Sequence, residues 1–102
     1  MRTGTEEHLQ QDIARALVRL GIPFEREPRL SGKDRPDFMV GGVAVEVKIK
    51  GGVTEVTRQL SRYAQHERVS ELLLVTSRMQ LVAVPTELNG KPVRVAMQWG
   101  FL

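Results

Sequence analysis

The chain of 102 residues is about the size of one small domain, and its 15 Lys and Arg against 12 Asp and Glu leave a formal net charge of +3. Hydrophobic residues at 41% and charged residues at 26% exclude disordered, collagen-like and coiled-coil proteins, and the absence of cysteine excludes disulfides, thiolate zinc sites and cysteine nucleophiles. No apolar run reaches the roughly 18 residues of a membrane span, and the N-terminus has no signal-like apolar stretch. We therefore expect a single domain over residues 1–102, without a membrane segment and located in the cytoplasm.

The first predicted element is an amphipathic helix from Glu6 to Leu20. Thr5 can cap its start and Gly21 can end it. Its apolar residues recur at helical spacing and are Leu9, Ile13, Ala16, Leu17 and Leu20. At about 100° per residue, Glu6 falls on this apolar face. Two interpretations stay open for Glu6: a first-turn glutamate favoured by the helix dipole, or a functional acid.

Two strands joined by a hairpin are expected in the middle of the chain. Residues 22–35 lead there through a short strand and a polar loop in which we find no recognisable chemistry. Pro36 to Val40 and Val43 to Ile49 both have strand patterns, and the Gly41-Gly42 pair between them is a hairpin signal.

The second half of the chain predicts one more helix and further strands. Thr54 to Arg68 has helical periodicity, with its inward side formed by Val53, Val56, Leu60 and Ala64. Strands are expected at Glu71 to Thr76, at Leu81 to Val84 and, after a turn at Asn89-Gly90, at Pro92 to Met97. This order predicts a mixed α/β (α+β) domain, in which a central sheet of about four to five strands has one helix on either side.

Two acids are predicted to face each other across the hairpin. A two-residue turn pairs Val40 with Val43, and the same register sets Asp37 opposite Glu46. Directly opposed residues share one sheet face with Cβ atoms about 4.5–5.5 Å apart, where like charges repel. Period-two alternation places Lys48 on the Glu46 face, and the other face is formed by Val43, Val45, Val47 and Ile49.

This arrangement predicts a metal site for phosphodiester hydrolysis. A divalent cation, Mg²⁺ or Mn²⁺, bound by Asp37 and Glu46 would offset their repulsion, with the backbone carbonyl of Val47 as a further ligand. Hydrolysis needs a more acidic water and a neutralised transition state, which a metal together with Lys48 can supply. The alternative is a solvated strand face with alternating charges, which would explain Glu46 and Lys48 but not two opposed acids.

Pro36-Asp37 followed by Glu46-Val47-Lys48 resembles the motif of the PD-(D/E)XK nucleases. The resemblance implies a restriction-endonuclease-like core and a catalytic set of Asp37, Glu46 and Lys48. Nucleases of this kind also have a glutamate on a helix before the motif, which Glu6 resembles, and a helix after it. The chain also resembles the stand-alone VRR-NUC and archaeal Holliday-junction-resolvase branches, which consist of little more than this fold and a homodimer interface.

Within the second predicted helix, the segment from Gln59 to Tyr63 resembles the QxxxY motif of the RecB-like branch. The resemblance implies that these two residues border the active site and help to hold DNA. Arg58, Arg62 and His66 fall on the exposed side of the same helix and could meet phosphates, although a solvated helix face explains them as well.

Size and resemblance together predict a structure-selective endonuclease that acts on branched or duplex DNA. Two alternatives stay open: a nucleic-acid-binding or assembly subunit with little turnover, and an RNA-directed nuclease. His8 and His66 are expected at the surface and are too few for a histidine-metal nuclease of the HNH type. The apolar ending from Trp99 to Leu102 either packs on the core or meets another subunit, and we expect a homodimer.

Overall fold

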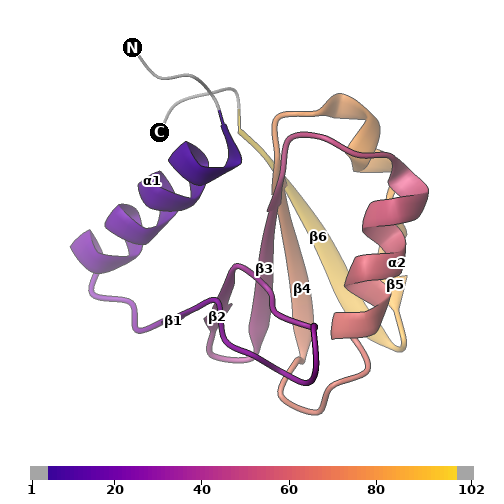
Figure 1. Ribbon diagram of the computed structural model, residues 1–102, viewed down its shortest axis with the longest axis horizontal. Helices are drawn as coiled ribbons and strands as arrows, with labels where there is room; N and C mark the ends of the chain where they lie inside the picture. The colour runs from indigo at the N-terminus through magenta and orange to yellow at the C-terminus, as the bar shows by residue number, and fades with distance from the viewer. Residues whose placement is uncertain (1–4, 99–102) are drawn as a thin grey trace.

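The computed structural model describes residues 5–98, which form a mixed six-stranded sheet with a helix on each face (Figure 1). The helices are α1 (Glu6–Arg19) and α2 (Val53–Tyr63), with a 3₁₀ helix η1 (Met79–Ala83). The strands are β1 (Glu25–Arg26), β2 (Phe38–Val40), β3 (Val43–Lys48), β4 (Glu71–Thr76), β5 (Glu87–Leu88) and β6 (Lys91–Met97). Their order across the sheet is β1-β2-β3-β4-β6-β5, so the sheet exceeds the expected size because two short strands form its edges. No helix within these residues is long and apolar enough to cross a membrane.

The β2–β3 hairpin has the predicted register. Val40 pairs with Val43, Met39 with Ala44 and Phe38 with Val45 in antiparallel fashion. Gly41 turns the chain with φ of 59°, in the left-handed region where glycine has no steric cost. Gly42 accepts a hydrogen bond from the backbone of Ser70 just before β4, and a Cβ at Gly42 would collide with the Ser70 hydroxyl.

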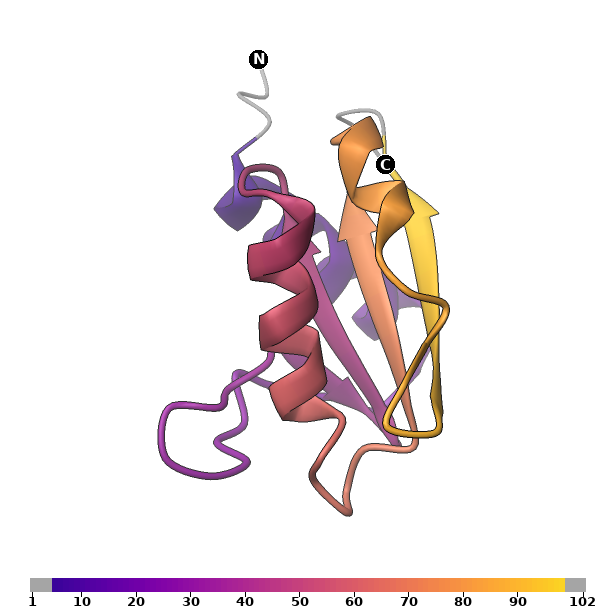
Figure 2. The same ribbon diagram turned by 90° about the vertical axis from the view of Figure 1, so that its right-hand side faces the viewer.

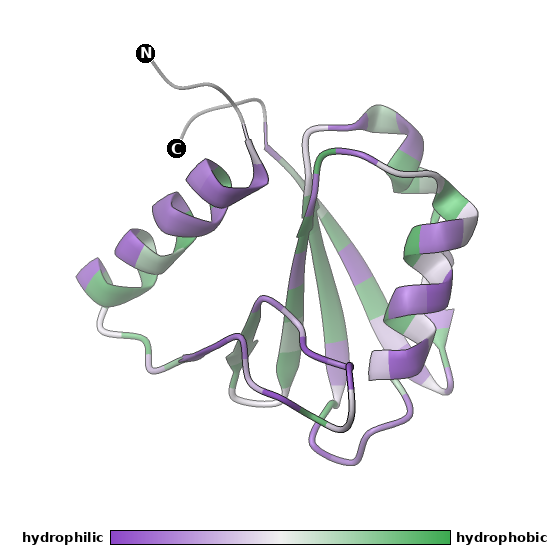
Figure 3. Ribbon diagram, viewed as in Figure 1, coloured by the Kyte–Doolittle hydropathy of each residue, from purple (hydrophilic) through white to green (hydrophobic). Residues whose placement is uncertain are grey.

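Each face of the sheet has its own hydrophobic core beneath one helix. The prediction of one helix on either side of the sheet is therefore confirmed. On the α1 side, Leu9 packs with Phe38, Val45, Val47 and Val75. On the α2 side, the buried cluster includes Val56, Leu60, Tyr63, Met39, Ala44, Leu72 and Leu74. Figure 3 shows the central strands as largely hydrophobic between helices that also carry many hydrophilic residues, which is why both helices can cover the sheet and face solvent.

The parallel strands β3 and β4 are joined through α2, which crosses the second face of the sheet (Figures 1 and 2). β6 adds to β4 in parallel and pairs with β5 in an antiparallel hairpin. Asn89 and Gly90 form the turn of that hairpin with φ of 53° and 77°, as the Asn-Gly signal predicts.

The start of α1 follows the sequence closely, whereas the end of α2 does not. Thr5 caps α1 by accepting a hydrogen bond from the His8 amide at 3.1 Å. The prediction that the second helix reaches Arg68 is wrong, because α2 ends at Tyr63. The chain turns there through short-range bonds such as His66 N to Tyr63 O, and Val69 is buried in the core. Two carbonyls in this turn accept hydrogen bonds from side chains outside it, because Asn89 donates to Ala64 O and Lys91 donates to His66 O.

The predicted strand at Leu81 to Val84 is also wrong, because η1 occupies this part of the chain. Leu81 and Val84 are buried while Val82 between them is 52% exposed, a spacing of three that suits a helical turn rather than strand alternation. Hydrogen bonds of the same spacing close the turn, from Leu81 N to Arg78 O and from Val84 N to Leu81 O.

Candidate active site

The site is centred on Glu46, a carboxylate that is only 4% exposed in the middle of the sheet. Interpreting its strand face as solvated is therefore wrong for this residue. Asp37, half-buried just before β2, extends the hairpin register toward Glu46. Its Oδ2 accepts a hydrogen bond of 2.7 Å from the Val47 amide, which anchors the Asp37 side chain on β3 beside Glu46.

The two acids change each other's titration. Burial raises the pKa of Asp37 to about 6, against the lowering effect of the Val47 hydrogen bond and the Lys48 charge. Burial, followed by the neighbouring charge of Asp37, raises the pKa of Glu46 to about 7. Without a cation, the pair therefore holds a proton at mildly acidic pH, and a positive charge between the carboxylates would displace it.

Lys48 lies on the same strand face as Glu46, as alternation predicts. Its Nζ is 3.5 Å from Glu46 Oε2, and about a quarter of its side chain is exposed. The intervening Val47 points into the opposite core and is fully buried. Lys48 thus joins the buried carboxylate to the solvent-facing edge of the site.

The two residues that resemble the QxxxY motif converge on the same carboxylate. The Tyr63 hydroxyl donates to Glu46 Oε1 at 3.0 Å and accepts from Gln59 Nε2 at 3.0 Å. Tyr63 is 1% exposed, and burial together with the charge of Glu46 raises the pKa of its hydroxyl. The hydroxyl therefore stays protonated at neutral pH and remains a donor to Glu46.

Glu6 reaches the end of the same strand from α1. Its Oε1 accepts from the Ile49 amide at 3.1 Å, and its charge raises the pKa of Asp37. The hydrogen bond joins two residues 43 positions apart, so Glu6 is held in place and is not a frayed first-turn residue. Thr5, Glu6, Ile49 and Lys50 line a hollow of about 290 Å³ at this point.

Cations border the site on the α2 side. A hollow of about 320 Å³ is lined by Lys48, Glu55, Arg58, Gln59 and Arg62. Arg58 is exposed as expected, whereas Arg62 donates through Nε to Asp34 Oδ1 at 3.0 Å.

The prediction that His66 lies at the surface is wrong, because its ring is half-buried and its Nε2 lies 3.0 Å from Asp34 Oδ2. His8 is half-buried as well.

Asp34 is the residue that the sequence does not reveal. It lies in the loop before β2, and the hydrogen bond with His66, followed by that with Arg62, lowers its pKa. The partners are 28 and 32 positions away, and no short-range pattern links them. The only signal is weak: one acid stands among three cations in a loop that otherwise lacks a periodic pattern.

The donor set suits a hard divalent cation. Among residues 5–98 no cluster of three or more His, Cys, Asp or Glu side chains is placed to hold a metal. Mg²⁺, however, commonly uses one or two carboxylates and keeps its remaining ligands as water or phosphate oxygens. Asp37 is half-buried, Glu46 is buried and the charge of Asp37 repels that of Glu46, so this pair of carboxylates fits that requirement.

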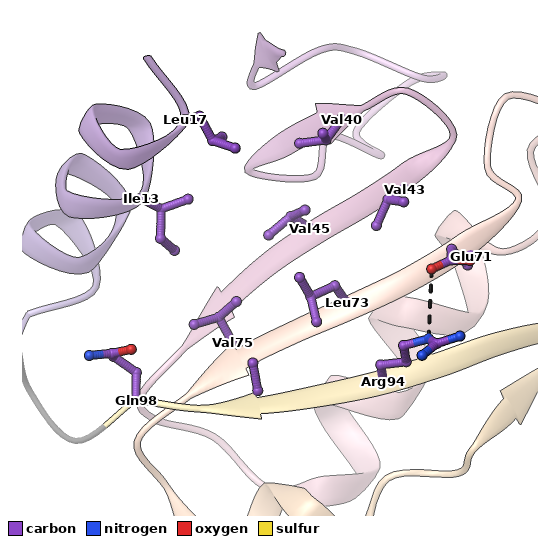
Figure 4. A pocket seen from close by; sticks show the side chains of 11 residues that line it. Ile13, Leu17, Val40, Val43, Val45, Glu71, Leu73, Val75, Arg94 and Gln98 are labelled. Carbon is purple, nitrogen blue, oxygen red and sulfur yellow. Dashed lines mark ion pairs between the residues drawn. The ribbon is translucent and has the colours of Figure 1, made fainter. Parts of the chain in front are cut away.

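A third hollow, of about 440 Å³, lies on the α1 face of the sheet away from the acids. Ile13 and Leu17 of α1 form one wall and residues of β2, β3, β4 and β6 form the floor (Figure 4). Its charged residues, Glu71 and Arg94, pair with each other at 3.8 Å. These walls can hold apolar groups but offer no hydrolytic chemistry.

Comparison of the chain with models of known protein families, with curated proteins and with solved structures found no match.

Proposed function

We propose that this chain is a divalent-metal-dependent nuclease of the PD-(D/E)XK type, with a restriction-endonuclease-like core. The observation that carries the proposal is the convergence of two separate motifs on one buried carboxylate. Asp37 and Lys48 lie beside Glu46, and Tyr63 donates to it from α2. A carboxylate is costly to bury beside a second acid, and burial together with the Asp37 charge raises the pKa of Glu46, which favours a functional reason for its position.

Each residue has a chemical role in this proposal. Asp37, Glu46 and the Val47 carbonyl hold Mg²⁺ or Mn²⁺, which when bound supplies charge neutralisation and a more acidic water. Lys48 orients the attacking water or stabilises negative charge that develops on the phosphate. Tyr63 and Gln59 orient Glu46, as outer partners commonly do for metal-binding carboxylates. Glu6 stands at the end of β3 as a further acid of the catalytic set.

The proposed substrate is DNA, in branched or duplex form, cut at internal positions in the cytoplasm. Lys48, Arg58 and Arg62 line a hollow next to the acids, which suits a phosphodiester backbone. Cations that contact the backbone position a strand without reading its bases, which favours selection by shape.

The proposed assembly is a homodimer. Val18 and Leu20 are 69% and 67% exposed at the end of α1, the helix that also forms one wall of the apolar hollow in Figure 4. An apolar projection and an apolar hollow on one molecule favour contact with a second copy. When a two-fold axis relates the two copies, the assembly stops at a dimer. The apolar segment from Trp99 to Leu102 lies outside the described residues.

The test is incubation with branched, duplex and single-stranded DNA and with RNA, each with Mg²⁺, Mn²⁺ or EDTA. We expect cleavage of DNA with metal and none with EDTA, and loss of cleavage in Asp37→Ala and in Glu46→Ala. Glu87→Ala, an exposed acid on β5, is the matched control and should cut normally. Binding of DNA without any metal-dependent cleavage would instead support a binding subunit, and cleavage of RNA alone would support an RNA-directed nuclease.

A further inference from the structure

The loop between β1 and β2 forms a separate group of cations beside the site. Arg29, Lys33 and Arg35, together with Gly32, line a hollow of about 370 Å³. All three cationic side chains are exposed, and within residues 5–98 no acidic side chain forms an ion pair with any of them. Three unpaired cations around one hollow repel each other, so an anion there would relieve a cost of the folded state.

The loop has a defined conformation. Asp34 N donates to Ser31 O at 2.7 Å and Leu30 N donates to Asp34 O at 2.8 Å, which closes a tight turn around Gly32. Gly32 has φ of 52°, and Leu30 packs against the core on the α2 side. The cations therefore project from a backbone that is already ordered, which lowers the entropy lost when they bind a ligand.

Asp34 fixes this loop to α2 and to the turn that follows it. Its two carboxylate oxygens contact Arg62 Nε and His66 Nε2, each at 3.0 Å. A carboxylate oxygen only accepts, so the second contact needs a proton on His66 Nε2. Figure 2 shows the loop projecting beside the C-terminal end of α2.

The loop also adjoins the acids. The carbonyl of Arg35 is 3.3 Å from the Tyr63 hydroxyl, which donates to Glu46. Arg62 lines the hollow next to Lys48 and at the same time contacts Asp34 of the loop. The Asp34–Arg62 pair thus joins the loop to the hollow that Lys48 and Arg58 line.

We propose that residues 29–35 are a phosphate-binding loop that holds the nucleic-acid backbone flanking the scissile phosphate, with Arg29, Lys33 and Arg35 as its phosphate ligands. Asp34 is a positioning residue that holds these cations in line with Lys48. The inference rests on the proposed nuclease function, and it extends the substrate from one phosphate to a strand that crosses α2 and the loop. Contacts of this kind position a strand without reading its sequence.

Binding is measured in EDTA, so that no cleavage interferes, with fluorescent single-stranded and duplex DNA over a range of salt concentrations. The variant Arg29→Ala/Lys33→Ala should reduce the slope of log Kd against log salt by about 1.4 on single strands and about 1.8 on duplex, because two phosphate contacts are lost. The matched control is Arg15→Ala/Arg68→Ala, which removes two exposed cations that line none of the hollows and should change the slope by less than half as much. Equal changes in both double variants would overturn the proposal.

Asp34→Ala separates positioning from charge. The variant gains one positive charge, so binding should tighten if charge alone matters, but it frees Arg62, His66 and the loop. For Asp34→Ala we expect a higher Kd and a smaller slope of log Kd against log salt. Glu87→Ala, with the same charge gain, should bind DNA at least as tightly as the unmodified chain. Tighter binding by folded Asp34→Ala, checked by circular dichroism, would show that Asp34 does not position the loop.

The outcomes also separate this inference from the proposed function. If the unmodified chain cleaves DNA but the loop variants bind normally, the loop assignment alone is wrong. If binding depends on the loop but no metal supports cleavage, the loop stands and the nuclease proposal falls. If the chain binds no nucleic acid under any condition, both are overturned.

Discussion

Glu46 and Asp37 are held together against their own repulsion, and this sets how stability depends on pH. Both carboxyls have raised pKa values in the folded chain, about 7 and about 6 against ordinary values of 4.5 and 3.8. The folded state therefore binds protons more tightly than the unfolded state. The stability that these groups contribute is complete below about pH 4 and is lost as the pH rises through the folded pKa values.

We expect the metal-free chain to be less stable at pH 7.5 than at pH 5, by on the order of 1–3 kcal/mol. Urea unfolding in EDTA at the two pH values measures the difference. Mg²⁺ at pH 7.5 should recover much of the loss, because it binds the ionised pair in the folded chain. Glu46→Gln should flatten the profile and be at least as stable as the unmodified chain at pH 7.5. An unchanged slope in Glu46→Gln would mean that other groups dominate.

Lys48 tests the division between binding and chemistry. We expect Lys48→Ala to lower kcat roughly 100- to 1,000-fold, as loss of one transition-state donor commonly does, while leaving the Kd for DNA nearly unchanged. Lys50→Ala is the control, because Lys50 is exposed two residues further along. Single-turnover cleavage and fluorescence anisotropy give the two quantities. An equal loss of binding in both variants would reduce Lys48 to one more cation facing phosphate.

At the scale of elements, α2 brings the most groups to the site. Its buried side packs Val56 and Leu60 on the sheet, and Tyr63 on the same side reaches Glu46 through its hydroxyl. Gln59 lies one turn earlier and donates a hydrogen bond to that hydroxyl. Together with Arg58 it also lines the hollow of about 320 Å³ beside Lys48. A spacing of four residues places Gln59 and Tyr63 on one helix face, so a single helix both covers the sheet and orients the carboxylate.

Two hydroxyl deletions on α2 should have opposite consequences. Tyr63→Phe removes the donor to Glu46, so we expect a loss of about 10- to 100-fold in metal affinity or cleavage rate. Thr57→Val removes a buried hydroxyl oxygen that has no hydrogen-bond partner in the described structure, so it should leave cleavage unchanged and raise stability by up to about 1 kcal/mol. Isothermal titration with Mn²⁺ and thermal melting provide both readouts. Similar behaviour of the two variants would show that Tyr63 only fills space.

At the scale of the whole molecule, the α1 face of the sheet is only partly covered. The hollow between α1 and the sheet reaches Ala96 of β6 and Gln98 just after that strand, and its lining is largely apolar. Val18 and Leu20 extend the apolar side of α1 into solvent. An open apolar surface of this kind is typical of a contact between subunits.

We expect multi-angle light scattering to show a dimer and Leu20→Glu to give monomers without loss of thermal stability, because the Leu20 side chain is 67% exposed. Val82→Glu, a matched change at an exposed apolar residue of η1, should stay dimeric. Deleting residues 99–102 should weaken the dimer and reduce cutting. A monomer at every concentration in the unmodified chain would exclude the dimer, and unfolding on deletion would assign those residues to the core.

The sequence by itself determined the features that depend on neighbours along the chain. The start of α1 follows from the Thr5 cap, and the Gly41-Gly42 turn sets the register that brings Asp37 toward Glu46. Strand alternation then assigns Lys48 to the Glu46 face, because successive side chains must point to opposite sides. These rules act over a few residues and need no knowledge of the fold.

Only the tertiary structure decided what depends on which elements pack together. The burial of Glu46, the contact of Glu6 with Ile49 and the hold of Asp34 on Arg62 join residues or layers far apart in sequence. Likewise α2 ends at Tyr63, although Ala64 would continue its apolar side, and the chain turns there and buries Val69. Local propensity is worth a few tenths of a kcal/mol per residue, whereas burial of one large apolar side chain is worth about 1.5–3 kcal/mol, so packing overrides the local pattern wherever the two disagree.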